Sequence, residues 1–114
     1  MHLVVDQKVF DSFPGLYLGL VEARGINNAG SSEEVLKFLQ TEQERIRASM
    51  SLETYREDPC FVAWQEAYAK FGGKPKKYRS SVENLHRMTL EGIEFQHINT
   101  LVDLYNLISL KHKL

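Results

Sequence analysis

The sequence predicts an α+β fold, with short strands at the N-terminus followed by about four helices. Two kinds of observation predict it. Up to residue 30, apolar runs alternate with turn residues, which is typical of short strands. After residue 30, four segments each begin with a Ser, Asp or Asn suited to a helix N-terminus, and each continues with apolar residues at helical spacing.

The predicted strands occupy the N-terminal part. Residues 3–5 form a short apolar run, residues 13–15 a turn, and residues 16–21 a second apolar run. The second run is apolar on both faces, which is typical of a buried strand. Gly25 and residues 27–30 end this pattern. A pair of strands is only marginally stable, so we expect further strands or helices to complete the sheet.

The first two helices are predicted from their N-terminal residues. Ser31 and Glu34 form a capping box, since both side chains can satisfy free backbone amides at a helix start. The apolar face of this helix carries Val35, Leu39, Ile46 and Met50. Asp58 and Pro59 begin the second helix, which ends at the two glycines 72 and 73. Its predicted core face carries Phe61, Trp64, Tyr68 and Phe71.

The last two helices follow the same logic. Ser80 and Glu83 form a second capping box, and Gly92 ends the helix that they begin. Asn99 and Thr100 begin the final helix, which runs to Leu110 or beyond. This helix is apolar almost all round, so we expect it to be buried.

The final helix nevertheless carries a polar stripe of Asp103, Asn106 and Ser109, one every third residue. Buried polar groups need hydrogen-bond partners. We expect Asp103 to accept hydrogen bonds from backbone amides at the helix start. For Asn106 two interpretations stay open. It could satisfy neighbouring backbone groups, or it could form the wall of a pocket and orient a substrate carbonyl or amine.

Composition narrows the class of protein. The chain has 114 residues, which fits one domain, and its net charge is −1. No apolar run is long enough to cross a membrane. The single cysteine, Cys60, is typical of a reducing compartment, so we expect a cytoplasmic protein. The four histidines show no metal-ligand spacing, and no cofactor-binding motif is present, so we expect neither a metal nor a cofactor.

Basic residues are concentrated ahead of the third helix. Lys74, Lys76, Lys77 and Arg79 surround Tyr78 and lead into the helix start at Ser80. Amines, a guanidinium group and free helix amides all suit phosphate, and single-stranded bases could stack on the tyrosine ring. The alternative is a solvated loop in which Arg79 pairs with an acid such as Glu83.

Two motifs carry a resemblance to a known family. The run F-G-G-K-P-K-K-Y-R-S-S-V-E at residues 71–83 resembles the F-G-x-x-P-x-K-Y-R-S-S-x-E signature of stand-alone B3/4 proteins. The run I-N-T-L-V-D-L-Y-N at residues 98–106 resembles the family's I-N-x-x-V-D-x-x-N segment. The same segment is V-D-V-T-N in the phenylalanyl-tRNA synthetase β subunit, whose editing site lies in a B3/4 domain. The chain is therefore similar to the N-terminal half of such a domain.

The resemblance implies a role in aminoacyl-tRNA editing. In the synthetase this domain hydrolyses the ester of wrongly charged tRNA, typically tyrosine on the phenylalanine tRNA, and stand-alone members resemble enzymes that do so in trans. Asn106 matches the asparagine of the family's Thr-Asn pair, whereas Tyr105 replaces its threonine in the pocket. The family's remaining site residues lie downstream of this helix. The resemblance thus implies that the chain alone lacks hydrolase activity.

Two explanations of the half-domain stay open: a piece of a longer protein, or a natural half that pairs with another chain. The missing C-terminal half or a second copy would then be a partner, beside tRNA. Alternative functions are a non-catalytic RNA-binding module that uses the 74–79 run, and a protein-interaction half-domain that uses the last helix. A half-domain should also leave an apolar edge and an apolar helix face uncovered, so we expect it to form oligomers or to be poorly soluble.

Overall fold

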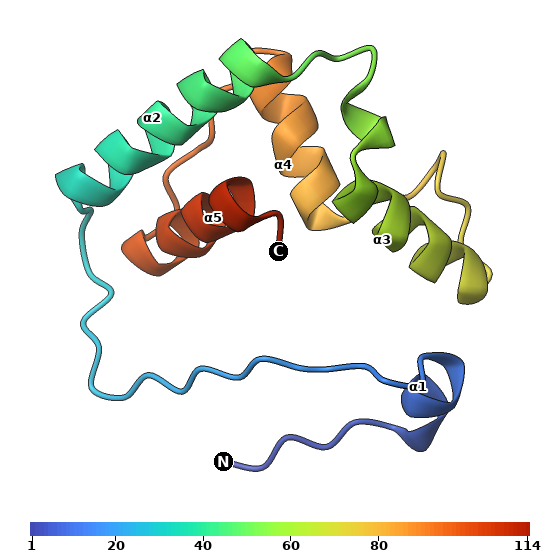
Figure 1. The fold of residues 1–114 in the computed structure, drawn as a ribbon. Coiled ribbons are helices and arrows are strands. Elements are labelled where there is room, and N and C mark those ends of the chain that lie inside the picture. Colours follow the sequence, from blue (N-terminus) through green and yellow to red (C-terminus); the bar gives the residue numbers. More distant parts are fainter.

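The computed structural model describes residues 1–114 as an all-helical chain (Figure 1). It contains no β-strand, so the predicted α+β class is wrong. The elements are five α-helices and one short 3₁₀ helix, in the order α1 Gln7–Ser12, α2 Glu33–Ser49, η1 Tyr55–Glu57, α3 Pro59–Lys70, α4 Ser81–Leu90 and α5 Thr100–His112.

The predicted strands failed because neither apolar run finds a partner strand. Residues 3–5 and 16–21 lie outside any helix, and no backbone hydrogen bond joins them to each other. A strand requires such a ladder. Between them lies helix α1, which the sequence analysis missed. Asp6 caps it, because its carboxylate accepts a hydrogen bond from the Lys8 N–H at 2.8 Å. The second run, predicted to be buried, is largely exposed.

The four predicted helices are confirmed, and three of their capping residues are as expected. Asp58, Ser80 and Asn99 each accept a hydrogen bond from a backbone N–H in the first turn of α3, α4 and α5. At α2 the cap is one residue later than predicted, because Ser32, not Ser31, accepts from the Val35 N–H at 3.3 Å. Gly92 follows the end of α4 with a φ of +75°, as a helix-terminating glycine does.

The core consists of two small clusters joined by α4. Leu39 and Ile46 of α2 pack with Leu110 of α5 in the first cluster, and Leu85 of α4 packs against them. The second cluster is formed by Tyr55 of η1, Phe61 of α3 and Val82 of α4. The predicted core face of α3 is therefore only partly correct. Phe61 is buried, but Trp64 and Phe71 are exposed, because the N-terminal segment covers that side of α3 only in part.

Helix α5 is oriented with its polar side inward. Asp103 is fully buried, and Asn106 and Ser109 are half-buried. The expectation that this helix is buried all round is wrong, since an outward stripe of large apolar side chains remains exposed: Leu101, Leu104, Tyr105 and Ile108. These positions share one helical face. An exposed apolar stripe of this length is unusual on a protein without a partner.

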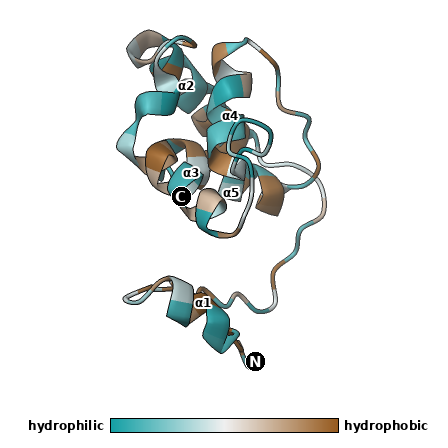
Figure 2. Cartoon of the chain, turned by 90° about the vertical axis from the view of Figure 1, so that its right-hand side faces the viewer, coloured by the Kyte–Doolittle hydropathy of each residue, from teal (hydrophilic) through white to brown (hydrophobic).

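The N-terminal segment runs alongside the helices as a separate arm, below them in the view of Figure 1 (Figures 1 and 2). It touches them at two places. The Phe13 ring lies 5.0 Å from that of Phe71, where Lys70 also donates to the Ser12 carbonyl at 3.0 Å. At the other end, Asn28 accepts a hydrogen bond from the Leu101 N–H at 2.9 Å.

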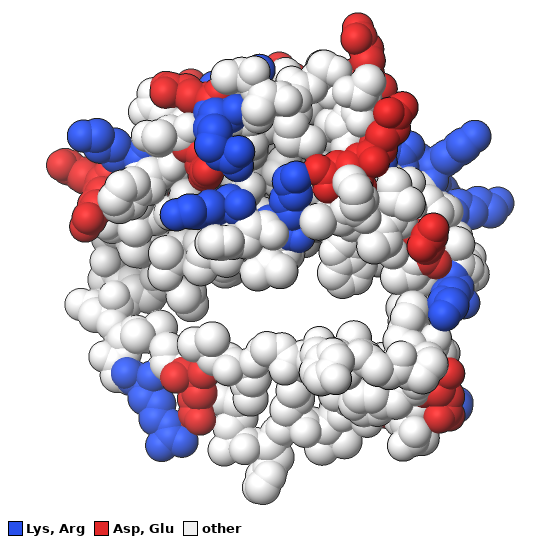
Figure 3. Space-filling model, viewed as in Figure 1, with Lys and Arg blue, Asp and Glu red and all other residues white.

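An opening separates the middle of this segment from the helices (Figure 3). The molecule is flat, with extents of 43 × 42 × 20 Å. Its radius of gyration is 16.1 Å, whereas a compact domain of this length has about 13 Å. The chain is therefore less compact than an ordinary domain, and the opening accounts for part of the difference.

Candidate functional site

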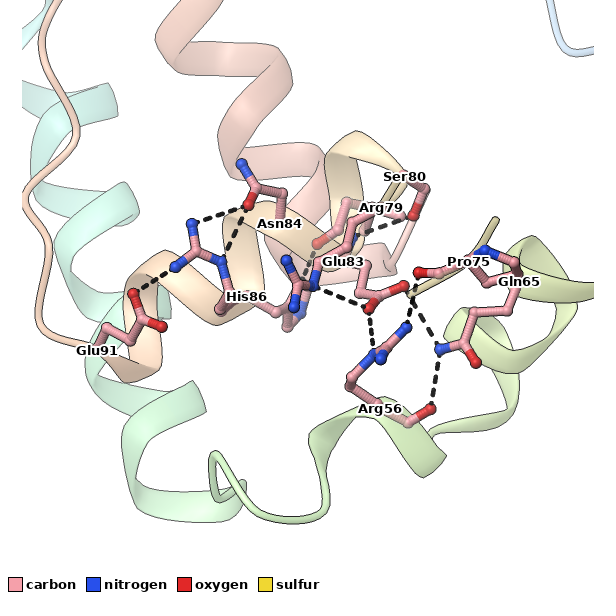
Figure 4. A network of polar contacts seen from close by, with 11 residues as sticks. Arg56, Gln65, Pro75, Arg79, Ser80, Glu83, Asn84, His86 and Glu91 are labelled. Atoms are coloured by element: carbon pink, nitrogen blue, oxygen red, sulfur yellow. Dashed lines mark hydrogen bonds and ion pairs between the residues drawn. The ribbon is translucent and has the colours of Figure 1, made fainter. Parts of the chain in front are cut away.

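The basic loop of residues 74–79 is anchored by one buried carboxylate (Figure 4). Glu83, only 1% exposed, accepts a hydrogen bond from Arg56 Nε at 2.7 Å, and Arg79 Nε lies 3.6 Å from the same oxygen. The Ser80 hydroxyl accepts from the Glu83 N–H at 3.3 Å. Glu83 therefore does not complete the predicted capping box, because its carboxylate is engaged by two arginines.

Arg56 extends this anchor to the loop itself. Its Nη2 donates to the Pro75 carbonyl at 3.0 Å, and its own carbonyl accepts from Gln65 Nε2 at 3.3 Å. Within the loop, the Lys77 N–H donates to the Lys74 carbonyl at 2.8 Å and closes a turn. Arg56 was missed by the sequence analysis, since it lies 27 residues from Glu83 and in no recognisable motif.

The anchored loop presents amines to solvent. Lys74, Lys76 and Lys77 are exposed, and none of them is paired with an acid. Tyr78 is also exposed, and the Lys77 Nζ lies 5.3 Å from its ring centre. Arg79 is different, because it pairs with Glu83 as the alternative interpretation predicted. The loop thus offers three free ammonium groups beside one aromatic face.

A second region surrounds Asn106. A hollow of about 360 Å³ lies between α4, α5 and their connection, and apolar residues form most of its lining: Leu85, Met88, Ile93, Phe95 and Ile98. Glu94, Gln96 and Asn106 complete it. The Asn106 amide makes no hydrogen bond within the chain. This is an arrangement expected of a pocket wall, with a few polar groups, Asn106 among them, in a mostly apolar surround.

The neighbours of Asn106 are placed differently from the prediction. Tyr105 does not line the hollow and is 53% exposed on the outward stripe of α5. Asp103 does not bind backbone amides, because Asn99 and Asn28 already accept from the Val102 and Leu101 N–H groups. Its carboxylate instead contacts His97 Nδ1 at 2.5 Å. The sequence gives a weak signal for this pair, a histidine two residues ahead of a helix cap.

The two regions lie at opposite ends of α4. The loop precedes Ser81, whereas the hollow is lined from Leu85 onward and continues into the connection after Leu90. Helix α4 has 10 residues, which corresponds to about 15 Å. The structure therefore does not bring the lysines and Asn106 into one pocket. A nucleic acid strand could contact both only by running along this helix.

Two other titratable groups have structural roles. His86 is buried, its Nδ1 lies 2.8 Å from the Val82 carbonyl, and its ring packs edge-on to Phe61 at 4.8 Å. Burial lowers the pKa of His86, and this residue is a core histidine with a hydrogen bond from its ring to the backbone. Burial alone would raise the pKa of Asp58, but hydrogen bonds from Lys113 and from the Cys60 N–H hold that pKa below its usual value.

No group of three His, Cys, Asp or Glu side chains is placed to hold a metal ion. None of the helices combines the length and the apolar character needed to cross a membrane. No protein-family model, curated protein or solved structure matches this chain.

Proposed function

We propose that this chain binds the acceptor end of aminoacyl-tRNA, as part of an editing site of the B3/4 type. The observation that carries the proposal is the anchored loop, in which Lys74, Lys76 and Lys77 project free ammonium groups beside Tyr78. The two sequence motifs at residues 71–83 and 98–106 support it, because they contain the loop and Asn106 in the order that the family has.

The chemistry of the loop suits a single-stranded 3′ end. Ammonium groups on flexible side chains contact phosphates as point charges, and an exposed tyrosine ring can stack on an unpaired base. The loop backbone is already fixed, because Arg56 donates a hydrogen bond to the Pro75 carbonyl and is itself bound by Glu83. Binding therefore does not have to order the loop, and this lowers the entropic cost of association.

The hollow beside Asn106 is the candidate site for the aminoacyl group. Its lining is mostly apolar, and the Asn106 amide has no hydrogen bond within the chain, so it can contact a carbonyl or an amine. Ester hydrolysis also requires an oriented water and a donor to the developing oxyanion. Asn106 could supply one of these and not both. We therefore expect this chain to bind tRNA. We do not expect the chain alone to hydrolyse the ester of a phenylalanine tRNA that is mischarged with tyrosine.

The test is RNA binding by a triple variant, Lys74→Ala, Lys76→Ala and Lys77→Ala. A matched control replaces the exposed lysines Lys8, Lys37 and Lys111, which removes the same charge elsewhere on the surface. For the unmodified chain and the control, the logarithm of tRNA affinity should fall linearly with the logarithm of salt concentration. Each lost phosphate contact should reduce this slope by roughly 0.7.

We therefore expect the loop variant to lose roughly 2 from the salt slope, and the control to keep the slope of the unmodified chain. Equal affinity and slope in the two variants would refute the role of the loop. Filter binding of uncharged tRNA and of a tRNA lacking its single-stranded 3′ end separates two cases. If both bind equally, the loop is a general RNA contact and not an acceptor-end site.

A further inference from the structure

A second hollow, which we call the α3 hollow, lies between helix α3 and the loop of residues 74–79. Its volume is about 400 Å³, and sites for small molecules measure ~300–1,000 Å³. One wall is a single face of α3, because residues three or four apart share a helical face: Val62, Glu66 and Ala69. The opposite wall comes from the anchored loop and from η1: Pro75, Lys76 and Arg56. The α3 hollow therefore lies beside the lysines of the loop and is separate from the hollow around Asn106.

Three charged side chains of the α3 hollow keep free hydrogen-bonding groups. Arg56 uses Nε for Glu83 and Nη2 for the Pro75 carbonyl, so its Nη1 makes no hydrogen bond within the chain. Glu66 and Lys76 are exposed and belong to no ion pair. The α3 hollow thus combines one free carboxylate and two cationic donors with apolar walls.

The guanidinium group of Arg56 is held in place before any ligand arrives. Its hydrogen bonds to Glu83 at 2.7 Å and to the Pro75 carbonyl at 3.0 Å fix its plane (Figure 4). Glu83 carries one negative charge and faces two guanidinium groups, those of Arg56 and Arg79, so one positive charge remains uncompensated. A fixed, positively charged donor favours a ligand that presents hydrogen-bond acceptors.

Among the four bases of RNA, guanine matches this set of groups best. Its Watson–Crick edge presents two adjacent donors, N1–H and the N2 amine, beside the acceptor O6. A carboxylate has two oxygens and can accept from both donors at once, and arginine is a common donor to guanine O6. Adenine, cytosine and uracil each present only one donor group on this edge, so each would form fewer hydrogen bonds with Glu66.

We propose that the α3 hollow binds a guanine base of single-stranded RNA. Glu66 accepts from N1–H and the N2 amine, Arg56 Nη1 donates to O6, and Lys76 contacts the phosphate. The inference deepens the proposed function and rests on it, because it takes the ligand from the RNA that the loop contacts. It adds a preference for one base, which lysines on phosphates do not supply.

The test is a titration of the full chain with guanosine, inosine, adenosine, cytidine and uridine 5′-monophosphates, followed by the NMR chemical shifts of the backbone amides. Guanosine monophosphate should shift the amides of Glu66, Ala69 and Lys76. It should bind about fivefold more tightly than each of the other four, because these lose at least one hydrogen bond. Inosine differs from guanosine only in lacking the N2 amine, so it isolates the contact of that amine with Glu66.

Two variants separate the role of Glu66 from a general effect on binding. Glu66→Ala replaces an exposed helical residue with a good helix former, so the fold is kept. In this variant guanosine and inosine monophosphates should bind equally. Ala69→Leu fills the α3 hollow and should weaken the binding of every nucleotide roughly tenfold. Ala63→Leu, on the side of α3 that shares a hollow with Leu16, is the matched control and should bind normally.

Short RNAs distinguish RNA from a free nucleotide as the source of the guanine. The pentamer U-U-G-U-U should bind roughly tenfold more tightly than guanosine monophosphate, because its neighbouring phosphates reach Lys74 and Lys77. It should also bind more tightly than U-U-U-U-U. A guanine pentamer that binds no more tightly than the mononucleotide would overturn RNA as the ligand.

The guanine site and the proposed function fail in different ways. If the triple lysine variant keeps its tRNA affinity while guanosine monophosphate still binds in the α3 hollow, the proposed function is wrong and the guanine site stands. If tRNA binding depends on the lysines but all five monophosphates bind equally, the guanine site is wrong. The same holds if none of them shifts the amides of the α3 hollow at millimolar concentration.

Discussion

Replacing Glu83 with Gln tests the anchor beneath the basic loop. The substitution keeps the size of the side chain, so no cavity contributes to its effect. It removes the negative charge of the Glu83 carboxylate, whose Oε1 lies 2.7 Å from Arg56 Nε and 3.6 Å from Arg79 Nε. It also places an amide N–H₂ group against a guanidinium group. The carboxylate is 1% exposed, so water cannot take its place without a rearrangement.

The expected loss of stability follows from how deeply the side chains of Glu83, Arg56 and Arg79 are buried. Removing one partner from a fully buried ion pair costs about 3–5 kcal/mol. The Arg56 side chain is 32% exposed, so solvent can stabilise its charge in part. We therefore expect the free energy of unfolding to fall by about 2 kcal/mol. For a chain of this length the midpoint temperature should fall by about 8 °C.

The assay is urea unfolding followed by circular dichroism, with Glu91→Gln as the matched control. Glu91 lies just beyond the end of the same helix and pairs with Arg87, but both side chains of that pair are partly exposed. The control should therefore lose less than about 0.5 kcal/mol. If the two variants lose equal stability, Glu83 does not anchor the loop and the reasoning is wrong. A cycle with Arg56→Met isolates the Arg56–Glu83 coupling.

Two further predictions concern pH and capping. Burial lowers the pKa of His86 in the folded chain, so the folded state favours the neutral imidazole. The contribution of His86 to the free energy of unfolding is therefore fully present above its unfolded pKa of about 6.5 and is lost as the pH falls below that value. Asp58 acts in the same direction at lower pH, because its lowered pKa adds stability above about pH 4 that is lost on acidification. Urea midpoints should therefore fall from pH 7.5 to pH 5 in the unmodified chain and stay more nearly constant in His86→Gln; equal slopes would contradict the first assignment. Asn99→Ala removes the cap of α5 and should cost about 1 kcal/mol. Asn27→Ala removes only an exposed hydrogen bond from the Ala29 N–H and should cost less than about 0.5 kcal/mol.

Local signals in the sequence predicted the helices well. Asp58, Ser80 and Asn99 each cap a helix because a short polar side chain reaches an amide two or three residues ahead, which depends on neighbouring residues only. Features of this kind need no information about distant parts of the chain.

Apart from the missed helix α1 and the one-residue shift of the α2 cap, the wrong predictions depend on what another segment does. The strand at residues 16–21 needed a neighbour that the chain does not supply, so its apolar run remains exposed. Trp64 and Tyr105 have the residue types of a core, but both remain exposed, because no other helix packs over their sides of α3 and α5. The Arg56–Glu83 pair is a contact between distant residues. The candidate site divides in the same way: the exposed lysines and Asn106 in a hollow were predictable, whereas the anchoring of the loop and the outward direction of Tyr105 were not.

The attachment of the N-terminal arm at both ends has a kinetic consequence. Phe13 holds one end against α3 and Asn28 holds the other against α5, so the chain between them is a tethered loop with few conformations left to lose. A molecule that meets this loop finds it already extended, and the encounter does not wait for a folding step. Because residues 16–21 carry no charge, the rate of this encounter should also be nearly independent of ionic strength. Encounters at the lysine loop, by contrast, should slow as salt is added.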